Sequence, residues 1–96
     1  MAAYVISEVE SLDESFFERY RALAAASIEQ FGGRYLVRGA IPDVVEDEIL
    51  PRRRLVIVEF PDMATARRWY ASSSYAEALA FRDRALTRRL MFVEGI

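Results

Sequence analysis

Apolar residues alternate or run together in four short stretches, and they recur every three or four residues in the segments between them. The short stretches predict β-strands over residues 3–10, 34–41, 55–60 and 89–94. The wider spacing predicts an amphipathic helix over 14–31 and a second helix from Asp62 to about residue 87, interrupted at 72–74. The order of elements is therefore β-α-β-β-α-β.

Capping residues mark the ends of both predicted helices. Asp13 and Asp62 can accept hydrogen bonds from the amides of the first turn. Ser74 and Glu77 have the spacing of a capping box, so we expect the second piece of the broken helix to begin there. The glycines at 32–33 end the first helix, because glycine adopts the left-handed conformation of a helix C-terminus without steric cost.

This order of elements predicts an α+β fold of the ferredoxin-like type. Two β-α-β halves give a four-stranded antiparallel sheet with the helices on one face. A length of 96 residues suits a single domain over 1–96. The strands are too apolar for the other face of the sheet to meet water, so a second copy of the chain is its expected cover. We therefore expect a homodimer.

The residue types that the chain lacks restrict its chemistry. It has no cysteine and no histidine, and all 13 of its Lys and Arg residues are arginine. Thiolate nucleophiles, imidazole bases and lysine Schiff bases are thereby excluded. No spacing of carboxylates suggests a metal site. We expect neither a metal nor a cofactor.

Charge and hydropathy limit the expected partners. A formal net charge of -2 gives no general attraction to nucleic acid or to an anionic membrane. No segment approaches the roughly 20 apolar residues of a membrane span, and the N-terminal residues lack the pattern of a signal peptide. We expect a cytoplasmic protein that does not contact membranes.

Several short motifs together carry a resemblance to a known family. They are Tyr4-Val5-Ile6, the run from Gly32 to Gly39, Glu59-Phe60-Pro61, Trp69-Tyr70, Ser72, Tyr75 and Arg82. With these motifs the whole chain resembles the domain of unknown function 1330 family, small bacterial proteins of the dimeric α/β-barrel superfamily. The resemblance implies a ferredoxin-like subunit whose sheet packs against that of a second subunit to form a barrel. It implies no activity, because the family's function is unknown.

Two charged residues inside predicted strands form the first candidate site. Arg38 precedes Gly39, and Glu59 lies near the end of the most apolar strand. If the two strands pair with both residues on one face, the guanidinium and the carboxylate can bind a polar ligand. Glu59 is then a candidate for proton transfer. The alternative is a structural or dimer ion pair. Arg34 is expected to be only a solvated strand start.

Aromatic residues of the broken helix form the second candidate site. Trp69, Tyr70 and Tyr75 could line a cavity between this helix and the sheet, with Tyr75 as a second candidate for proton transfer. Arg82 lies two helical turns beyond Tyr75 and could hold an acid in the same cleft. The alternative is ordinary core packing, because aromatic residues at helical spacing are usually core.

An arginine run at 52–54 could bind an anion or lie in solvent beside nearby acidic residues. RNA-recognition domains share the order of elements, but they present aromatic rings on their central strands. The strand over 55–60 offers mainly aliphatic residues where rings would be needed. We therefore do not expect nucleic-acid binding.

Two functions from different classes remain open. The first is a homodimeric small-molecule binding protein or cofactor-independent enzyme acting on a small organic acid or aromatic compound. It rests on analogy with other dimeric α/β-barrel families. The second is a non-catalytic interaction or regulatory module, in which Arg38 and Glu59 form structural or dimer ion pairs.

Overall fold

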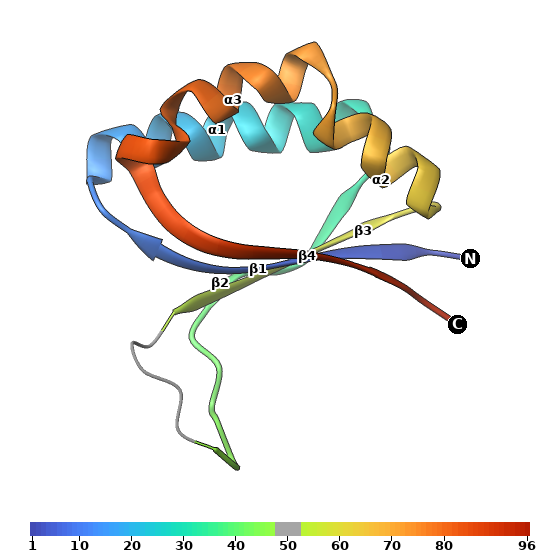
Figure 1. Ribbon diagram of the computed structural model, residues 1–96, viewed down its shortest axis with the longest axis horizontal. Coiled ribbons are helices and arrows are strands. Elements are labelled where there is room, and N and C mark those ends of the chain that lie inside the picture. The colour runs from blue at the N-terminus through green and yellow to red at the C-terminus, as the bar shows by residue number, and fades with distance from the viewer. Residues whose placement is uncertain (48–52) are drawn as a thin grey trace.

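The structure, a computed structural model, describes residues 1–47 and 53–96. Within these residues the chain forms one four-stranded antiparallel sheet with three helices on one face (Figure 1). The elements are β1 (Ala3–Ser11), α1 (Glu14–Gln30), β2 (Arg34–Ala40), β3 (Arg54–Phe60), α2 (Met63–Tyr70), α3 (Ser73–Ala85) and β4 (Leu86–Glu94). The predicted ferredoxin-like order is confirmed, with the second helix divided into α2 and α3. None of the described helices is long and apolar enough to cross a membrane.

The strands lie in the order β2-β3-β1-β4, so β1 and β3 are central. In β1, residues alternate between the side that faces the helices, which is buried, and the outer side, which is more exposed. Val5 lies opposite Val58 of β3 and Phe92 of β4, and all three face the helices. This register assigns every paired residue of the central strands to one face of the sheet.

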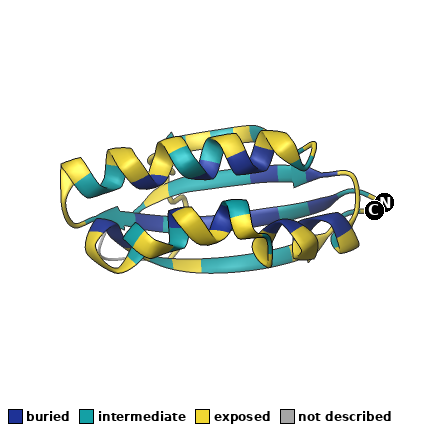
Figure 2. Cartoon of the chain, turned by 90° about the horizontal axis from the view of Figure 1, so that it is seen from above, coloured by how far each residue is buried: buried dark blue, intermediate teal, exposed yellow. Residues whose placement is uncertain are grey.

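The core lies between the helix-facing side of the sheet and the inner sides of the helices (Figure 2). Trp69 is at its centre, with its ring centroid 4.2 Å from that of Tyr75 and 5.3 Å from that of Phe60. The Trp69 Nε1 donates to Ser27 Oγ at 3.0 Å, which links α2 to α1. For Trp69, the interpretation as core is therefore correct.

The observed helix caps match two of the three predictions. Asp13 accepts from the amides of Ser15 and Phe16 at 2.9 and 3.2 Å, and Asp62 accepts from that of Thr65 at 2.7 Å. The predicted cap at Ser74 is wrong.

Helix α3 is capped instead by Ser72. Its Oγ accepts from the Tyr75 amide at 3.1 Å and donates to the Trp69 carbonyl at 2.7 Å. One hydroxyl thus satisfies the end of α2 and the start of α3, which Ser74 is too far along the chain to do.

Strand β2 contains two irregularities that set its side-chain directions. Tyr35 pairs with Val58 and Val37 with Ile57, so Leu36 is an extra residue. A second shift lies at Gly39, which has a φ of 90°. Each extra residue reverses the alternation of faces along the strand.

Strand β4 begins three residues earlier than predicted. Ser11 already pairs with Leu86, the residue after the end of α3. The polar residues 87–89 conceal this start in the sequence. Alternate positions nevertheless face the helices, so Arg88 points to the helix side between Leu86 and Leu90.

Replacing Gly33 with Asn should destabilise the fold more than the same change at Gly32. A Cβ at Gly33 would lie 2.7 Å from Phe60 Cε1 and 2.8 Å from Ile28 Cγ2, and such overpacking costs about 1–3 kcal/mol. At Gly32 nothing lies within 4 Å, and Asn tolerates its φ of +74°. Urea denaturation of both variants measures the difference. Equal losses would contradict the close packing at Gly33.

The buried bond between Trp69 and Ser27 can be tested with a double-mutant cycle. Ser27→Ala leaves the indole N–H without its acceptor, and we expect a loss of about 1–3 kcal/mol in unfolding free energy. In a Trp69→Phe background that donor is gone, so the same change should cost clearly less. Denaturant titration of the four proteins gives the coupling energy. A coupling near zero would show that the bond does not stabilise the fold.

Candidate functional site

A cavity of about 100 Å³ lies between α1 and the sheet. Residues of α1 and of all four strands line it, and Trp69 of α2 borders it as well. The strand residues come from the helix-facing side, for example Val5, Val58 and Leu90. Most of the wall is therefore apolar.

The charged residues that line this cavity are arginines from four different elements. They are Arg21 of α1, Arg38 of β2, Arg54 of β3 and Arg88 of β4. Arg21, Arg38 and Arg54 are exposed, so the cavity reaches the surface on their side. No Asp or Glu belongs to the lining within residues 1–47 and 53–96. Arg21 pairs with Glu18 at 3.8 Å, outside the lining, so the positive charge that favours an anion here comes mainly from the other three arginines.

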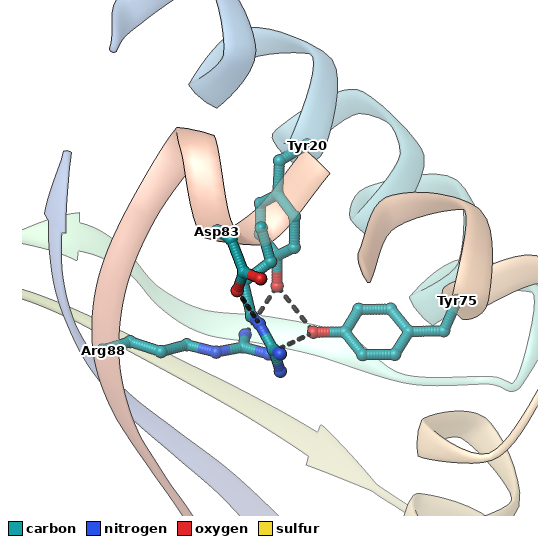
Figure 3. Close-up of polar contacts among 5 residues, drawn as sticks. Tyr20, Tyr75, Asp83 and Arg88 are labelled. Atoms are coloured by element: carbon teal, nitrogen blue, oxygen red, sulfur yellow. Dashed lines mark hydrogen bonds and ion pairs between the residues drawn. The ribbon is translucent and has the colours of Figure 1, made fainter. Parts of the chain in front are cut away.

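Arg88 joins two tyrosines into a hydrogen-bonded cluster (Figure 3). Its Nη1 donates to the Tyr20 hydroxyl at 2.6 Å and its Nη2 to the Tyr75 hydroxyl at 2.8 Å. The two hydroxyls lie 2.6 Å apart and share a third hydrogen bond. Since Tyr20 comes from α1 and Tyr75 from α3, this Tyr20–Tyr75–Arg88 cluster connects both long helices to the edge strand β4.

The electrostatics of the cluster keep the phenol neutral and the guanidinium charged. Burial, reinforced by the neighbouring Tyr75, raises the pKa of Tyr20 far above its ordinary value. Burial acts to lower the pKa of Arg88, but hydrogen bonds and charge interactions with the two phenolic oxygens outweigh it and raise that pKa. At neutral pH the Tyr20 hydroxyl is therefore a hydrogen-bond donor and not a general base.

The Tyr20–Tyr75–Arg88 cluster contains more hydrogen-bond donors than its own acceptors can use. Both phenolic oxygens accept from Arg88, and only one phenolic proton can lie between them. The other O–H has no acceptor among the described residues. Two of the five N–H groups of Arg88 are also occupied, which leaves three. Arg88 borders both this cavity and the groove of Tyr70 and Arg82, so these N–H groups are available to a negatively charged group on either side.

The predicted pair of Arg38 and Glu59 is wrong. Arg38 lies opposite Val56 on the helix side, where its guanidinium is 4.5 Å from the centroid of the Tyr35 ring. Glu59 lies on the outer face and pairs with Arg34 at 2.7 Å. The extra residue in β2 turns Arg38 to the other side. Arg34, expected to be only solvated, therefore holds the carboxylate.

The aromatic set predicted along the broken helix is divided between two places. Trp69 lines the cavity, and Tyr75 reaches the Arg88 guanidinium beside it. Tyr70 and Arg82 line a separate, more open groove, which Asp83 and Arg88 also border. Arg82 there contacts Asp83 at 3.4 Å. These two residues therefore do not belong to the cavity site.

Sequence reasoning missed Arg88 altogether and saw Tyr20 only as part of an apolar helix face. The signal for Arg88 was its position two residues from Leu86 and two from Leu90, within one alternating row. Of the arginine run, Arg54 lines the cavity and donates to the Gly39 carbonyl at 3.2 Å. Arg52 lies outside the described residues.

Solved structures with the same fold are numerous and distant in sequence. A protein of unknown function from Rhodopseudomonas palustris is 16% identical with a TM-score of 0.81, covering 99% of this chain and 82% of that one. SnoaB, a cofactor-independent oxygenase from Streptomyces nogalater, is 14% identical with a TM-score of 0.67, covering 99% and 93%. A dimeric ferredoxin-like protein of unknown function from a Jannaschia species is 12% identical with a TM-score of 0.66, covering 99% and 100%.

These identities establish the fold and leave the activity open. No curated protein matches the sequence. The family model described as domain of unknown function 1330 matches residues 2–96, which is nearly the whole chain. The chain therefore belongs to the domain of unknown function 1330 family.

Proposed function

We propose that this protein is a homodimer that binds a small organic acid in the cavity beneath α1. The observation that carries the proposal is the composition of the cavity wall, in which the charged residues, among those that the structure describes, are four arginines and no carboxylate. Arg88 and the spare phenolic hydroxyl of the Tyr20–Tyr75–Arg88 cluster would hold the acid group. Hydrogen bonds between a guanidinium and a carboxylate are among the strongest in proteins.

The size of the cavity favours a ligand with one small ring or a short chain. Its volume of about 100 Å³ is of the order of the roughly 150 Å³ that holds benzene in an apolar protein cavity. The exposed Arg21, Arg38 and Arg54 leave room at the mouth for further atoms. An apolar wall with a few convergent donors is the usual composition of a small-molecule site.

The donors are suited to stabilise negative charge on a bound ligand. Donors of this kind can bind an anionic ligand, and they can also stabilise the transition state of a reaction in which negative charge develops on an oxygen atom. One protein of similar fold is described as a cofactor-independent oxygenase, which supports the second use. Glu59 has no part in it, because it faces away from the cavity. The interaction-module alternative loses the Arg38–Glu59 pair, because the two residues lie on opposite faces, but it keeps the ion pair of Glu59 with Arg34 on the outer face.

The outer face of the sheet supports the homodimer. Ile6 lies at its centre, opposite Ile57 on one side and Met91 on the other. Ion pairs flank this apolar centre, Arg34 with Glu59 at 2.7 Å and Arg89 with Glu8 at 3.5 Å. Two proteins of similar fold are described as dimeric. A second sheet packed here would remove the apolar centre from water.

Benzoate is the probe for the acid site. Titration calorimetry should show binding to the native protein, and Arg88→Gln should weaken it about tenfold to a hundredfold, because charged hydrogen bonds are lost. Arg84→Gln, a change at an exposed arginine of α3, should bind as the native protein does. Circular dichroism shows whether Arg88→Gln is folded. Unchanged binding by a folded Arg88→Gln protein would place the acid elsewhere.

The dimer is tested by placing a charge at the centre of the outer face. Sedimentation should give the native protein twice the mass of one chain, and Ile57→Arg the mass of a single chain, because a buried guanidinium without a partner opposes association. Ala26→Arg, the same charge on the exposed side of α1, should stay dimeric. A native protein that is monomeric at micromolar concentration would contradict the proposed assembly.

A further inference from the structure

Ser7 is the exception in an otherwise apolar row of the central strand β1. Along β1 the adjacent residues on the helix-facing side are Val5 and Val9. On the neighbouring strands, Val56 of β3 and Leu90 of β4 lie opposite Ser7. The residue is 5% exposed, and its Oγ has no hydrogen-bond partner within the described part of the chain. A buried hydroxyl without a partner destabilises a fold, so its presence requires an explanation.

The other two buried serine and threonine side chains of the described residues have hydrogen-bond partners. Ser27 Oγ donates to the Ala24 carbonyl at 2.8 Å and accepts from Trp69 at 3.0 Å. Thr65 Oγ1 donates to Asp62 at 2.7 Å. Ser7 differs from both because it lines the cavity rather than a packed interface. Its hydroxyl is therefore positioned to bond with whatever occupies that cavity.

The strand register places Ser7 near Arg88 on the same face of the sheet. Val9 lies opposite Arg88 and Ser7 opposite Leu90, so Ser7 and Arg88 are diagonal neighbours on adjacent strands and on the same face. Diagonal neighbours are roughly 7–8 Å apart, and their Cβ atoms are somewhat closer than that. Both residues line the cavity. A ligand about one ring long can therefore contact both at once.

We infer that Ser7 binds a second polar group of the ligand, which is a ring acid carrying a hydroxyl or carbonyl group away from its carboxylate. This inference rests on the proposed acid site at Arg88. A serine hydroxyl both donates and accepts, so it suits either group. The second group is neutral, because the residues directly opposite Ser7, Val56 and Leu90, are apolar. The diagonal neighbour on β3, Arg54, is exposed and already donates to the Gly39 carbonyl at 3.2 Å.

The test compares benzoate with its three monohydroxy derivatives in the native and Ser7→Ala proteins by titration calorimetry. We expect 3- or 4-hydroxybenzoate to bind the native protein about three- to tenfold more tightly than benzoate, the effect of one hydrogen bond. Ser7→Ala should abolish this gain and leave benzoate binding unchanged. The hydroxyl of 2-hydroxybenzoate bonds to its own carboxylate and stays beside Arg88, so this isomer should show no dependence on Ser7.

The folded state provides a second readout. Without ligand, Ser7→Ala should melt at the same temperature as the native protein or a few degrees higher, because an unpaired buried hydroxyl is removed. Ser7→Cys, nearly the same size and a weak donor, should also lose the gain in affinity and replaces Ser7→Ala if that protein does not fold.

The outcomes separate the two proposals. If benzoate binds but neither the 3- nor the 4-hydroxy isomer binds more tightly, or if the gain persists in Ser7→Ala, the role of Ser7 is overturned and the acid site stands. If none of the four acids binds the native protein, the acid site and the role of Ser7 are both overturned.

Discussion

The bridge from Arg88 to two phenolic oxygens is the interaction on which the architecture of this site depends. It joins α1, α3 and the edge strand β4 through one side chain, at distances of 2.6 and 2.8 Å. The charge lies beneath the helices without a carboxylate, because Tyr20 and Tyr75 share its hydrogen bonds instead. Within the described residues, these hydrogen-bond partners are neutral and do not cancel the positive charge. In the proposed function, a ligand acid supplies the negative charge at little cost in reorganisation.

The extra residue at Leu36 in β2 decides which charged side chains of this strand face the cavity. A regular strand would put Arg34 and Arg38 on the same face. The extra residue at Leu36 instead separates them, so that Arg34 holds Glu59 on the outer face and Arg38 lines the cavity. The same backbone feature therefore keeps the carboxylate out of the site and supplies one of its arginines. Arg38 and Glu59, which were predicted to form a pair, therefore lie on opposite faces of the sheet.

The fold could be predicted because each of its signals is local. Alternation fixed the faces of β1, the aspartates at 13 and 62 fixed two helix starts, and glycines 32–33 fixed an end. The site could be predicted only in part, because it depends on register. The alternation from Leu86 to Leu90 could have placed Arg88 on the helix-facing side, but only the pairing of Arg88 with Val9 brings it to this cavity. The bulges of β2 could not be predicted for the same reason, since a bulge depends on the partner strand and on the packing around it.

Two polar side chains interrupt apolar rows on the helix-facing wall of this cavity. Ser7 carries an unsatisfied hydroxyl at a position where a valine would continue the row of β1. Arg88 occupies a helix-facing position of β4 between two leucines, where an aliphatic residue would avoid burying a charge. Both lie on the same cavity wall, as diagonal neighbours on adjacent strands. Arg88 has a structural role through its bonds to Tyr20 and Tyr75, whereas the Ser7 hydroxyl has no partner within the described residues. The proposed ligand, in contact with both side chains, would account for the hydroxyl that packing leaves unexplained.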